Sequence, residues 1–321
     1  MTQVVNAYRA WRFAQVDVRL ISSRDGSRGL RGVGRFLRAA RSIRRIGDPS
    51  QNLVVVHLSQ GGSFVREGAL LRLARRRGYA TVAHLHGSSF VEFARRRPAL
   101  VAKVLTSASR VFVLSDAMHE AVASVVASDR IAIVPNAVPA GHPGPKERRV
   151  VFGGSVSRRK GVDVLIDAWR TSGAGRGWHL DVAGPITEPD LVPGSLPDAT
   201  FHGALPHGRL MRMLDEAEVA VLPSRDEAMP MFILEAMARD VCVIGTSVGG
   251  VPRVLGGGAG MLVEPGCSAS LAHAFDQVLG SDARRHELAA AGARRFHDRH
   301  SAATLYPELE RLWLETLESR T

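Results

Sequence analysis

The sequence predicts an α/β protein of two domains, each built around a parallel β-sheet. The chain has 321 residues, which is long for one compact core and comfortable for two. Short runs rich in β-branched residues alternate with longer amphipathic segments, and this alternation is typical of βα units with parallel strands. Residues 137–149 interrupt it with three prolines and two glycines, which is typical of a linker between domains.

Five strands are predicted in the first half of the chain. They are expected at residues 16–22, 52–59, 80–87, 110–115 and 130–136. Helical periodicity lies between them, at residues 63–78 and 115–127. Ser115 is the expected N-cap of the second helix, because Asp116 and Glu120 place acidic charge near its start.

The alternation restarts after the linker. Five more strands are expected at residues 149–155, 178–185, 199–205, 218–224 and 242–247. A helix is expected to begin at Gly161, and residues 268–320 are helical by period. Ligands of such sheets bind outside the carboxyl ends of the strands, so functional motifs are expected directly after each strand.

Composition favours a globular protein. Hydrophobic residues make up 45% of the chain and charged residues 23%, as in ordinary globular domains. No apolar run approaches the roughly 18 residues of a membrane span, and the N-terminus lacks a signal-peptide core. Cys242 and Cys267 make neither a disulfide framework nor a metal set. We therefore expect a soluble, cytoplasmic protein in a reducing compartment.

The net charge of +11 is concentrated in the first half of the chain. Residues 1–150 hold 25 Lys and Arg against 9 Asp and Glu, whereas residues 151–321 hold 17 against 22. Clusters at residues 74–79 and 93–103 are suited to anionic lipid, a phosphorylated substrate or nucleic acid. A solvated arginine-rich surface explains them equally well.

The first candidate site follows a predicted strand in "FGGSVSRRKGVDVLIDAW" (152–169). Glycines allow close approach to the backbone, free N–H groups at a helix start favour an anion, and Lys160 adds a point charge. Lys160 is one of three lysines against 39 arginines, a mild indication of a specific role. Phosphate binding is one interpretation, and a basic loop closed by an ordinary glycine turn is the other.

The second candidate site is "SRDEAMPMFILEAMARD" (224–240), a strand end followed by a loop and a helix. Glu227 lies in the loop, Pro230 is well placed as the first helical residue, and Glu235 lies about a turn and a half inside the helix. The loop backbone can present N–H groups to a phosphate, and a carboxylate can accept hydrogen bonds from sugar hydroxyls. The alternative for Glu235 is an ion pair with an arginine on the far face.

Two weaker signals follow other strands. His84 and His86 lie on the same side of a strand end by period two, but no third metal ligand is near them in sequence, so buried structural histidines are the alternative to a site. A Gly-Gly turn precedes a helix within residues 247–255 and suggests a loop that faces a ligand.

Together these stretches resemble the retaining, nucleotide-sugar-dependent glycosyltransferases of family 4, which have the GT-B fold. "VVFGGSVSRRKGVDVLIDAW" (150–169) is similar to the family's phosphate-binding loop and helix, and residues 217–255 match its E-x7-E region, with Glu227 and Glu235 in register. Residues 111–122 and 130–138 resemble the approach between the domains. Residues 59–93 resemble a subgroup that builds bacterial surface polysaccharides.

The resemblance implies two Rossmann-like domains whose parallel sheets face each other across a cleft. The implied division is 1–142 for the acceptor-side domain, 143–303 for the nucleotide-sugar-binding domain, and 304–321 for a C-terminal helix that packs back on the first domain. In the family a first strand and a Gly-rich loop precede a segment like "VVNAYRAW" (4–11), whereas here Met1 stands three residues before Val4. We therefore expect that strand and loop to be absent, either because the start is misplaced or because the protein lacks part of its acceptor-side site.

The same resemblance implies roles for single residues. Lys160 would neutralise the donor diphosphate, Glu235 would hold the ribose hydroxyls, Glu227 would lie beside the transferred sugar, and His86 would contact that sugar. The implied catalytic residues are His86, Glu227 and Lys160. The implied donor contacts are Gly154, Ser155, Arg159, Lys160, Met229, Pro230, Met231, Phe232 and Glu235. No metal and no cofactor are expected, because fixed N–H dipoles and Lys160 can stabilise the leaving diphosphate.

Two departures from the family pattern concern the site. Ser155 stands where the family usually has an arginine, so Arg158 or Arg159 is expected to substitute for it. Ala228 replaces the usual glycine after the first glutamate, a small change.

The predicted function is hexosyl transfer, with retention of configuration, from a nucleoside-diphosphate sugar to a glycan or lipid-linked acceptor. The basic half is compatible with peripheral contact at the inner face of an anionic membrane. The alternatives are a catalytically impaired nucleotide-sugar-binding protein of the same fold, and a nucleic-acid binder suggested by the pI of 10.9. Nucleic acid is not the expected partner, because aromatic residues are only 6% and the basic runs show no recognition motif. A glycosidase with paired carboxylates is disfavoured because it has no phosphate to hold.

Overall fold

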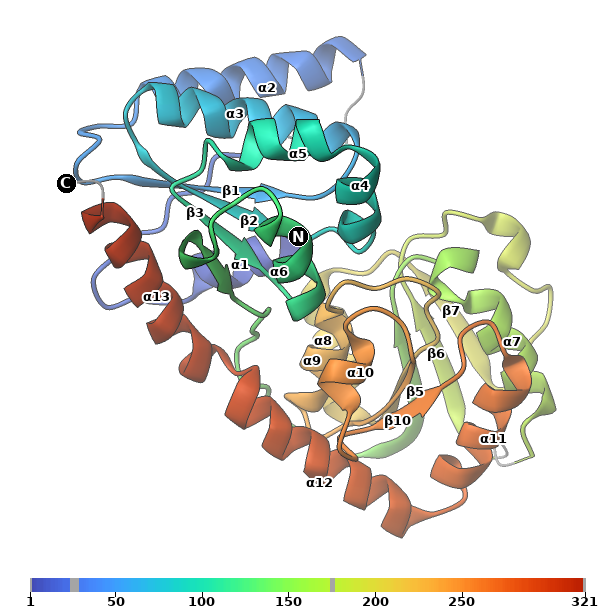
Figure 1. Ribbon diagram of the computed structural model, residues 1–321. Coiled ribbons are helices and arrows are strands. Elements are labelled where there is room, and N and C mark those ends of the chain that lie inside the picture. Colours follow the sequence, from blue (N-terminus) through green and yellow to red (C-terminus); the bar gives the residue numbers. More distant parts are fainter. Residues whose placement is uncertain (1, 24–28, 174–176, 320–321) are drawn as a thin grey trace. The chain divides into compact units, whose positions relative to one another are not determined.

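The chain folds into two compact units. The computed structural model describes residues 2–23, 29–173 and 177–319. The first unit is Met1–Asn136 with Leu305–Thr321, of which residues 320 and 321 lie outside the described ranges, and the second is Ala137–Thr304. Figure 1 shows the two units and their elements.

The first unit is built on a four-stranded parallel sheet in the order β1-β2-β3-β4. These strands confirm four of the five predictions for the first half. Their bounds are β1 Leu53–Leu58, β2 Ala80–Leu85, β3 Arg110–Val113 and β4 Ile131–Ile133. Every residue of β2 is buried, which is the expected pattern for a strand inside a parallel sheet.

Helices pack against this sheet. Helix α3 (Gly62–Arg76) packs on β1 and β2, and α2 (Gly29–Arg44) packs on α3. Helix α6 (Asp116–Ala123) begins as predicted, because the Ser115 side chain accepts a hydrogen bond from the N–H of Met118. The remaining helices of this unit's first part are α1 Thr2–Ala10, α4 Phe90–Arg96 and α5 Pro98–Leu105.

The strand predicted at residues 16–22 does not form. The structure has no regular element there, and no strand precedes Leu53 among the described residues. The N–H groups of Ala14, Gln15 and Val16 donate instead to the carboxylate of Glu310, at 3.2, 2.6 and 3.0 Å. Alternation of apolar residues suggested a strand, but the segment has no sheet neighbour, and Leu20 stays 48% exposed.

The second unit is built on a six-stranded parallel sheet in the order β10-β9-β8-β5-β6-β7. Its first five strands in chain order confirm the predictions, and β10 was not predicted. The bounds are β5 Glu147–Gly153, β6 His179–Ala183, β7 Ala199–Gly203, β8 Ala217–Leu222, β9 Cys242–Thr246 and β10 Met261–Val263.

Helices surround this sheet and extend to the end of the chain. Helix α7 (Val162–Thr171) follows the first loop and α9 (Met231–Met237) follows the second candidate loop. The other helices of this unit are α8 His207–Glu216, α10 Val251–Leu255, α11 Ser268–Leu279 and α12 Asp282–Arg299. The last helix, α13 (Ala302–Glu318), belongs to the first unit from Leu305 onward. Among the described residues, no helix is both long enough and apolar enough to span a bilayer.

Candidate functional site

The strand order of the second unit marks one place at the carboxyl edge of its sheet. β5 and β8 are neighbours although β6 and β7 come between them in sequence, and the chain winds outward from this pair in opposite directions. Ligands of doubly wound sheets bind at such a switch point, outside the carboxyl ends of the strands. The loops that leave β5 and β8 here are residues 154–161 and 223–230, the two strongest candidates from the sequence.

The loop after β5 is fixed by its own polar groups and by a required glycine. Ser157 Oγ accepts a hydrogen bond from the N–H of Lys160 at 3.4 Å and caps a short 3-10 turn. Gly161 has φ +71°, and a Cβ there would lie 1.9 Å from the carbonyl oxygen of Pro223. Only glycine permits this approach, so the loop after β5 and the loop after β8 are held in direct contact.

An ion pair joins the same two loops. Lys160 Nζ donates to Glu227 Oε1, and Ser224 Oγ donates to the same oxygen at 2.8 Å. The side chains of Lys160 and Glu227 are 16% and 10% exposed, so the pair is largely screened from solvent. The structure thus brings together two residues that lie 67 positions apart in sequence.

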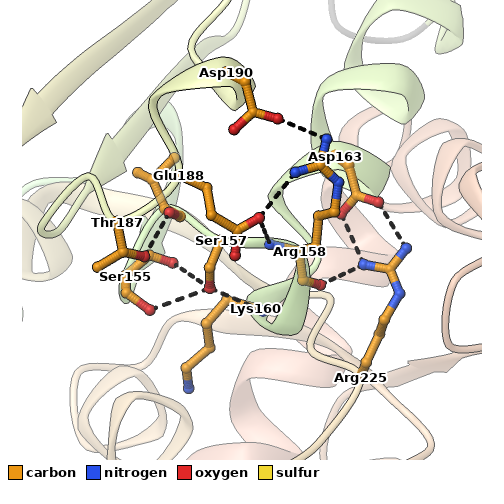
Figure 2. Close-up of polar contacts among 10 residues, drawn as sticks. Ser155, Ser157, Arg158, Lys160, Asp163, Thr187, Glu188, Asp190 and Arg225 are labelled. Atoms are coloured by element: carbon orange, nitrogen blue, oxygen red, sulfur yellow. Dashed lines mark hydrogen bonds and ion pairs between the residues drawn. The ribbon is translucent and has the colours of Figure 1, made fainter.

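The neighbouring arginines differ in their partners (Figure 2). Arg158 donates to Glu188 at 3.0 Å and Asp190 at 2.7 Å, and these contacts raise the pKa of its guanidinium. Arg225 makes two 2.7 Å contacts with the carboxylate of Asp163, which raise its pKa in the same way. Both guanidinium groups are thereby neutralised by carboxylates.

Arg159 lies against the second loop instead. Its Nη1 donates to the carbonyl oxygen of Asp226 at 3.2 Å, and its own carbonyl oxygen accepts from the N–H of Arg225 at 2.9 Å. Ser155 turns its hydroxyl to Ser157, 3.3 Å away. Of the two arginines considered as substitutes for the family's arginine, Arg158 is paired with carboxylates, whereas Arg159 contacts a backbone carbonyl group of the second loop.

A second position that requires glycine lies against the backbone of Glu227. Gly249 has φ +50°, and a Cβ there would lie 1.6 Å from the carbonyl oxygen of Glu227. The N–H of Gly250 donates to that oxygen at 3.3 Å. The Gly-Gly turn after β9, noted in the sequence as a ligand-facing loop, therefore holds the backbone of the Glu227 loop.

Glu235 lies on α9 and is only 7% exposed. Burial raises the pKa of its carboxyl group to about 7, although the nearby charge of Arg239 opposes the shift. His207 Nε2 lies 3.5 Å from Glu235 Oε1. Arg239 does not pair with this carboxylate, because its Nε lies 2.8 Å from Asp215 Oδ1 and its Nη1 donates to the carbonyl oxygen of Glu235. Among the described residues, therefore, no arginine forms the ion pair with the Glu235 carboxylate that the sequence left open as an alternative.

The remaining candidates of this unit lie in the same two loops or at the start of α9. Gly154 faces the aliphatic part of Lys160, since a Cβ there would lie 3.7 Å from both Cδ and Cε. The ring of Phe232 covers Gly153, where a Cβ would lie 2.4 Å from Phe232 Cδ2. Met229 and Phe232 are buried, and α9 begins at Met231, so Pro230 is the residue before the helix rather than its first member.

His86 lies in the first unit, after β2. Its Nε2 is 2.8 Å from Nδ1 of His57, and His84 completes a cluster of three rings. Burial lowers the pKa of His57 to about 4 and the pKa of His84 and His86 well below the ordinary value, so all three rings are neutral at pH 7. His57 was missed by sequence reasoning because it comes from the neighbouring strand, 29 positions before His86.

Both halves of the chain match known families. Residues 4–141 match the sequence model described as Glycosyltransferase Family 4, and residues 147–281 match the one described as Glycosyl transferases group 1. Models of glycosyltransferase domains thus match both halves of the chain, and the two parallel-sheet α/β units have the GT-B fold. The two matched segments correspond to the two units of the structure, each with its own parallel sheet.

Similar proteins agree with this fold. Sucrose-phosphate synthase from Thermosynechococcus elongatus superposes with a TM-score of 0.72 over 90% of this chain and 79% of that chain, at 19% identity. Anabaena Alr3699/HepE in complex with UDP-glucose gives 0.71 over 89% and 82%, at 17% identity. Glycogen synthase of Mycobacterium tuberculosis is 31% identical over 160 residues, which are 47% of this chain and 38% of that protein. The match to that curated relative thus spans well under half of its length.

Proposed function

We propose that this GT-B protein transfers a sugar from a nucleoside-diphosphate sugar to an acceptor hydroxyl with retention of anomeric configuration. The observation that carries the proposal is the Lys160–Glu227 pair, which joins the loops after β5 and β8 at the switch point of the second sheet. A phosphate-type loop supplies a lysine that contacts the buried carboxylate of Glu227, and a second buried carboxylate, Glu235, lies on the helix after the second loop. That combination suits a donor with both a diphosphate and sugar hydroxyls.

In the proposed reaction the bond from the anomeric carbon to the diphosphate oxygen breaks. The acceptor oxygen forms a new bond to that carbon, and the acceptor proton passes to the departing diphosphate. Negative charge develops on the leaving group, so a fixed cation beside it stabilises the transition state more than the ground state. Lys160 supplies that cation, and Arg159 adds a second positive charge at the edge of the same loops.

The ion pair positions Lys160 before the donor binds. An ammonium group has three N–H donors, so Nζ can contact Glu227 and still donate to a phosphate oxygen. Glu227 in turn accepts from the buried hydroxyl of Ser224, which fixes its carboxylate. We assign Glu227 to the transferred sugar, where its second carboxylate oxygen can accept from a sugar hydroxyl.

Glu235 is assigned to the ribose. Its buried carboxylate has no arginine partner among the described residues, so hydroxyl donors from a ligand would compensate its burial. The N–H groups of Met231 and Phe232 begin α9 and lack intrahelical acceptors, and they are assigned to the donor phosphate or sugar. His86 is assigned to the sugar from the first unit.

We further propose a glycan or lipid-linked acceptor at a membrane surface, on the strength of the positive charge of residues 1–150. Flotation with anionic and with neutral vesicles checks this part alone. Binding to anionic vesicles that weakens with salt is expected, and equal absence from both would remove the membrane from the proposal.

The central test is a thermal-shift screen of nucleoside diphosphates and their sugars, followed by a transfer assay with the stabilising donor. A ligand that binds only the folded state raises the melting temperature, and Lys160→Ala and Glu235→Gln should reduce that rise. Arg158→Ala is the matched control, because its guanidinium is held by Glu188 and Asp190. Nucleotide binding without any turnover would favour the catalytically impaired alternative, and no nucleotide binding would refute the proposal.

A further inference from the structure

We propose that His57, His84 and His86 bind one divalent transition-metal ion of the Zn²⁺ class in the first unit. All three histidines belong to the first unit. One of them, His86, is also assigned to the sugar in the proposed function, whereas His57 and His84 have no role in the proposed transfer reaction. The sequence did not predict it, because only two of its three ligands are close together in the chain.

The sheet places the three rings on one face. His57 of β1 and His84 of β2 are register partners, and laterally paired residues of parallel strands point to the same side of a sheet. His86 follows His84 by two residues, which returns its side chain to that side, and its N–H donates to the carbonyl oxygen of Leu58 at 2.8 Å. Two neighbouring strand ends therefore fix all three backbones.

The nitrogens are close to the geometry that a metal needs. One ring nitrogen from each histidine lies within 4.8 Å of the other two, and the closest pair, His57 Nδ1 and His86 Nε2, is 2.8 Å apart. Three imidazoles bound to zinc at 2.0–2.1 Å in tetrahedral geometry have their nitrogens about 3.3 Å apart. The nitrogen spacings, from 2.8 Å to at most 4.8 Å, bracket that value, and the ring centroids are 4.2 to 5.2 Å apart.

The environment of the rings favours a bound ion over an empty cluster. His84 is fully buried, and the backbone of Val134 lies close enough to its ring to oppose the fall of its pKa. Within the described ranges, however, neither ring nitrogen makes a hydrogen bond of normal geometry. A buried polar group without a partner is unfavourable, and coordination would satisfy it. Three neutral imidazoles are also the donor set of known zinc sites, with a fourth position left for water.

The surroundings allow access while excluding competing charges. His57 and His86 are half-buried, so an ion can reach the cluster from solvent. The ring of Tyr8 lies 5.9 Å from His57, and the ring of Phe112 lies 5.7 Å from His84. Within the described part of the chain, the group of possible ligands found here consists of the three histidines alone. Imidazole donors without carboxylates favour Zn²⁺, Cu²⁺, Ni²⁺ or Co²⁺ over Mg²⁺ and Ca²⁺.

The test is a metal titration of the full chain, purified without a histidine tag and stripped with a chelator. Co²⁺ should produce a visible d–d absorption that saturates at one ion per chain, and Zn²⁺ should abolish it. Mg²⁺ should leave it unchanged. Zn²⁺ affinity is then measured by competition with a chromogenic chelator, in the absence of any donor or acceptor, so the result does not depend on the proposed function.

Single variants assign the site. His57→Gln, His84→Asn and His86→Gln should each lower the Zn²⁺ affinity at least about 100-fold, whereas His119→Gln on α6 of the same unit should not change it. His57 and His86 are half-buried, so their variants carry the test if His84→Asn fails to fold; circular dichroism identifies that case. Wild-type protein that takes up no Co²⁺ or Zn²⁺, or cluster variants that bind as tightly as wild type, would overturn the proposal.

Discussion

Glu235→Gln tests whether a buried, ionisable carboxylate is kept in α9 for a ligand. In the wild type, burial raises the pKa of this carboxyl from 4.5 to about 7. The folded state therefore binds more protons than the unfolded state between these two values, and the free energy of unfolding must fall as pH rises through that window. A glutamine at this position has no such titration.

The size of the effect follows from the pKa difference. One pKa unit corresponds to about 1.4 kcal/mol, so ionising the buried carboxyl costs the wild type about 3 kcal/mol by pH 8 relative to pH 4.5. For a domain of this size each kcal/mol shifts the melting temperature by about 2–4 °C. We expect the melting temperature of Glu235→Gln, relative to that of the wild type, to rise by roughly 6 to 12 °C between pH 4.5 and pH 8.

The assay is thermal unfolding of both proteins from pH 4.5 to pH 8, followed by circular dichroism, with donor nucleotide absent and then present. Glu264→Gln is the matched control, since the side chain of Glu264 is exposed rather than buried. Without nucleotide the variant gains stability at high pH, and with nucleotide the wild type should recover more than the variant. Parallel curves for Glu235→Gln and wild type, within about 1 °C across the range, would refute the argument from burial.

Three further changes test other features of the structure. Lys160→Ala should lower turnover about 10²- to 10³-fold in a donor assay, while Arg158→Ala stays near wild type; equal losses would remove Lys160 from the charge-stabilising role. Gly249→Ala should lower the free energy of unfolding, measured with denaturant, by at least about 2 kcal/mol, because Gly249 has φ +50° and an added Cβ would collide with a carbonyl oxygen. Gly194→Ala is the control, because a Cβ at Gly194 would meet no atom within 4 Å. An unchanged stability of Gly249→Ala would contradict the geometry. Glu310→Ala should leave the N–H groups of Ala14, Gln15 and Val16 without their carboxylate acceptor, speed their hydrogen exchange and lower the free energy of unfolding by roughly 2–4 kcal/mol. Unchanged exchange would mean that these hydrogen bonds to Glu310 are not formed in solution.

The sequence was sufficient for most of the two sheets. Nine strands were found because they contain runs rich in β-branched and other apolar residues that are bounded by turn residues. β10 (Met261–Val263) was missed because only one of its three residues, Val263, is β-branched. The segment 16–22 was wrongly assigned because alternation does not reveal whether a strand has a neighbour to pair with.

The candidate site divides in the same way. Lys160, Glu227 and the glycines around them follow strand ends, so their shared location could be inferred from the rule for parallel sheets. The contact between Lys160 and Glu227, and the absence of an arginine partner for the Glu235 carboxylate among the described residues, depend on side-chain packing that no local pattern encodes. His57 was invisible for the same reason, since only the register of β1 against β2 places it beside His84.

The hydrogen bonds from the segment after α1 to Glu310 can form only late in synthesis, because Glu310 lies near the end of the chain. The second unit is a continuous stretch, Ala137–Thr304, and all of it leaves the ribosome before Glu310 does. Until then Tyr8 and Phe13, whose rings pack against Tyr306 in the finished protein, remain without that cover. The nascent chain can therefore complete its second unit while the first still exposes aromatic surface, and that surface favours aggregation until α13 has been synthesised.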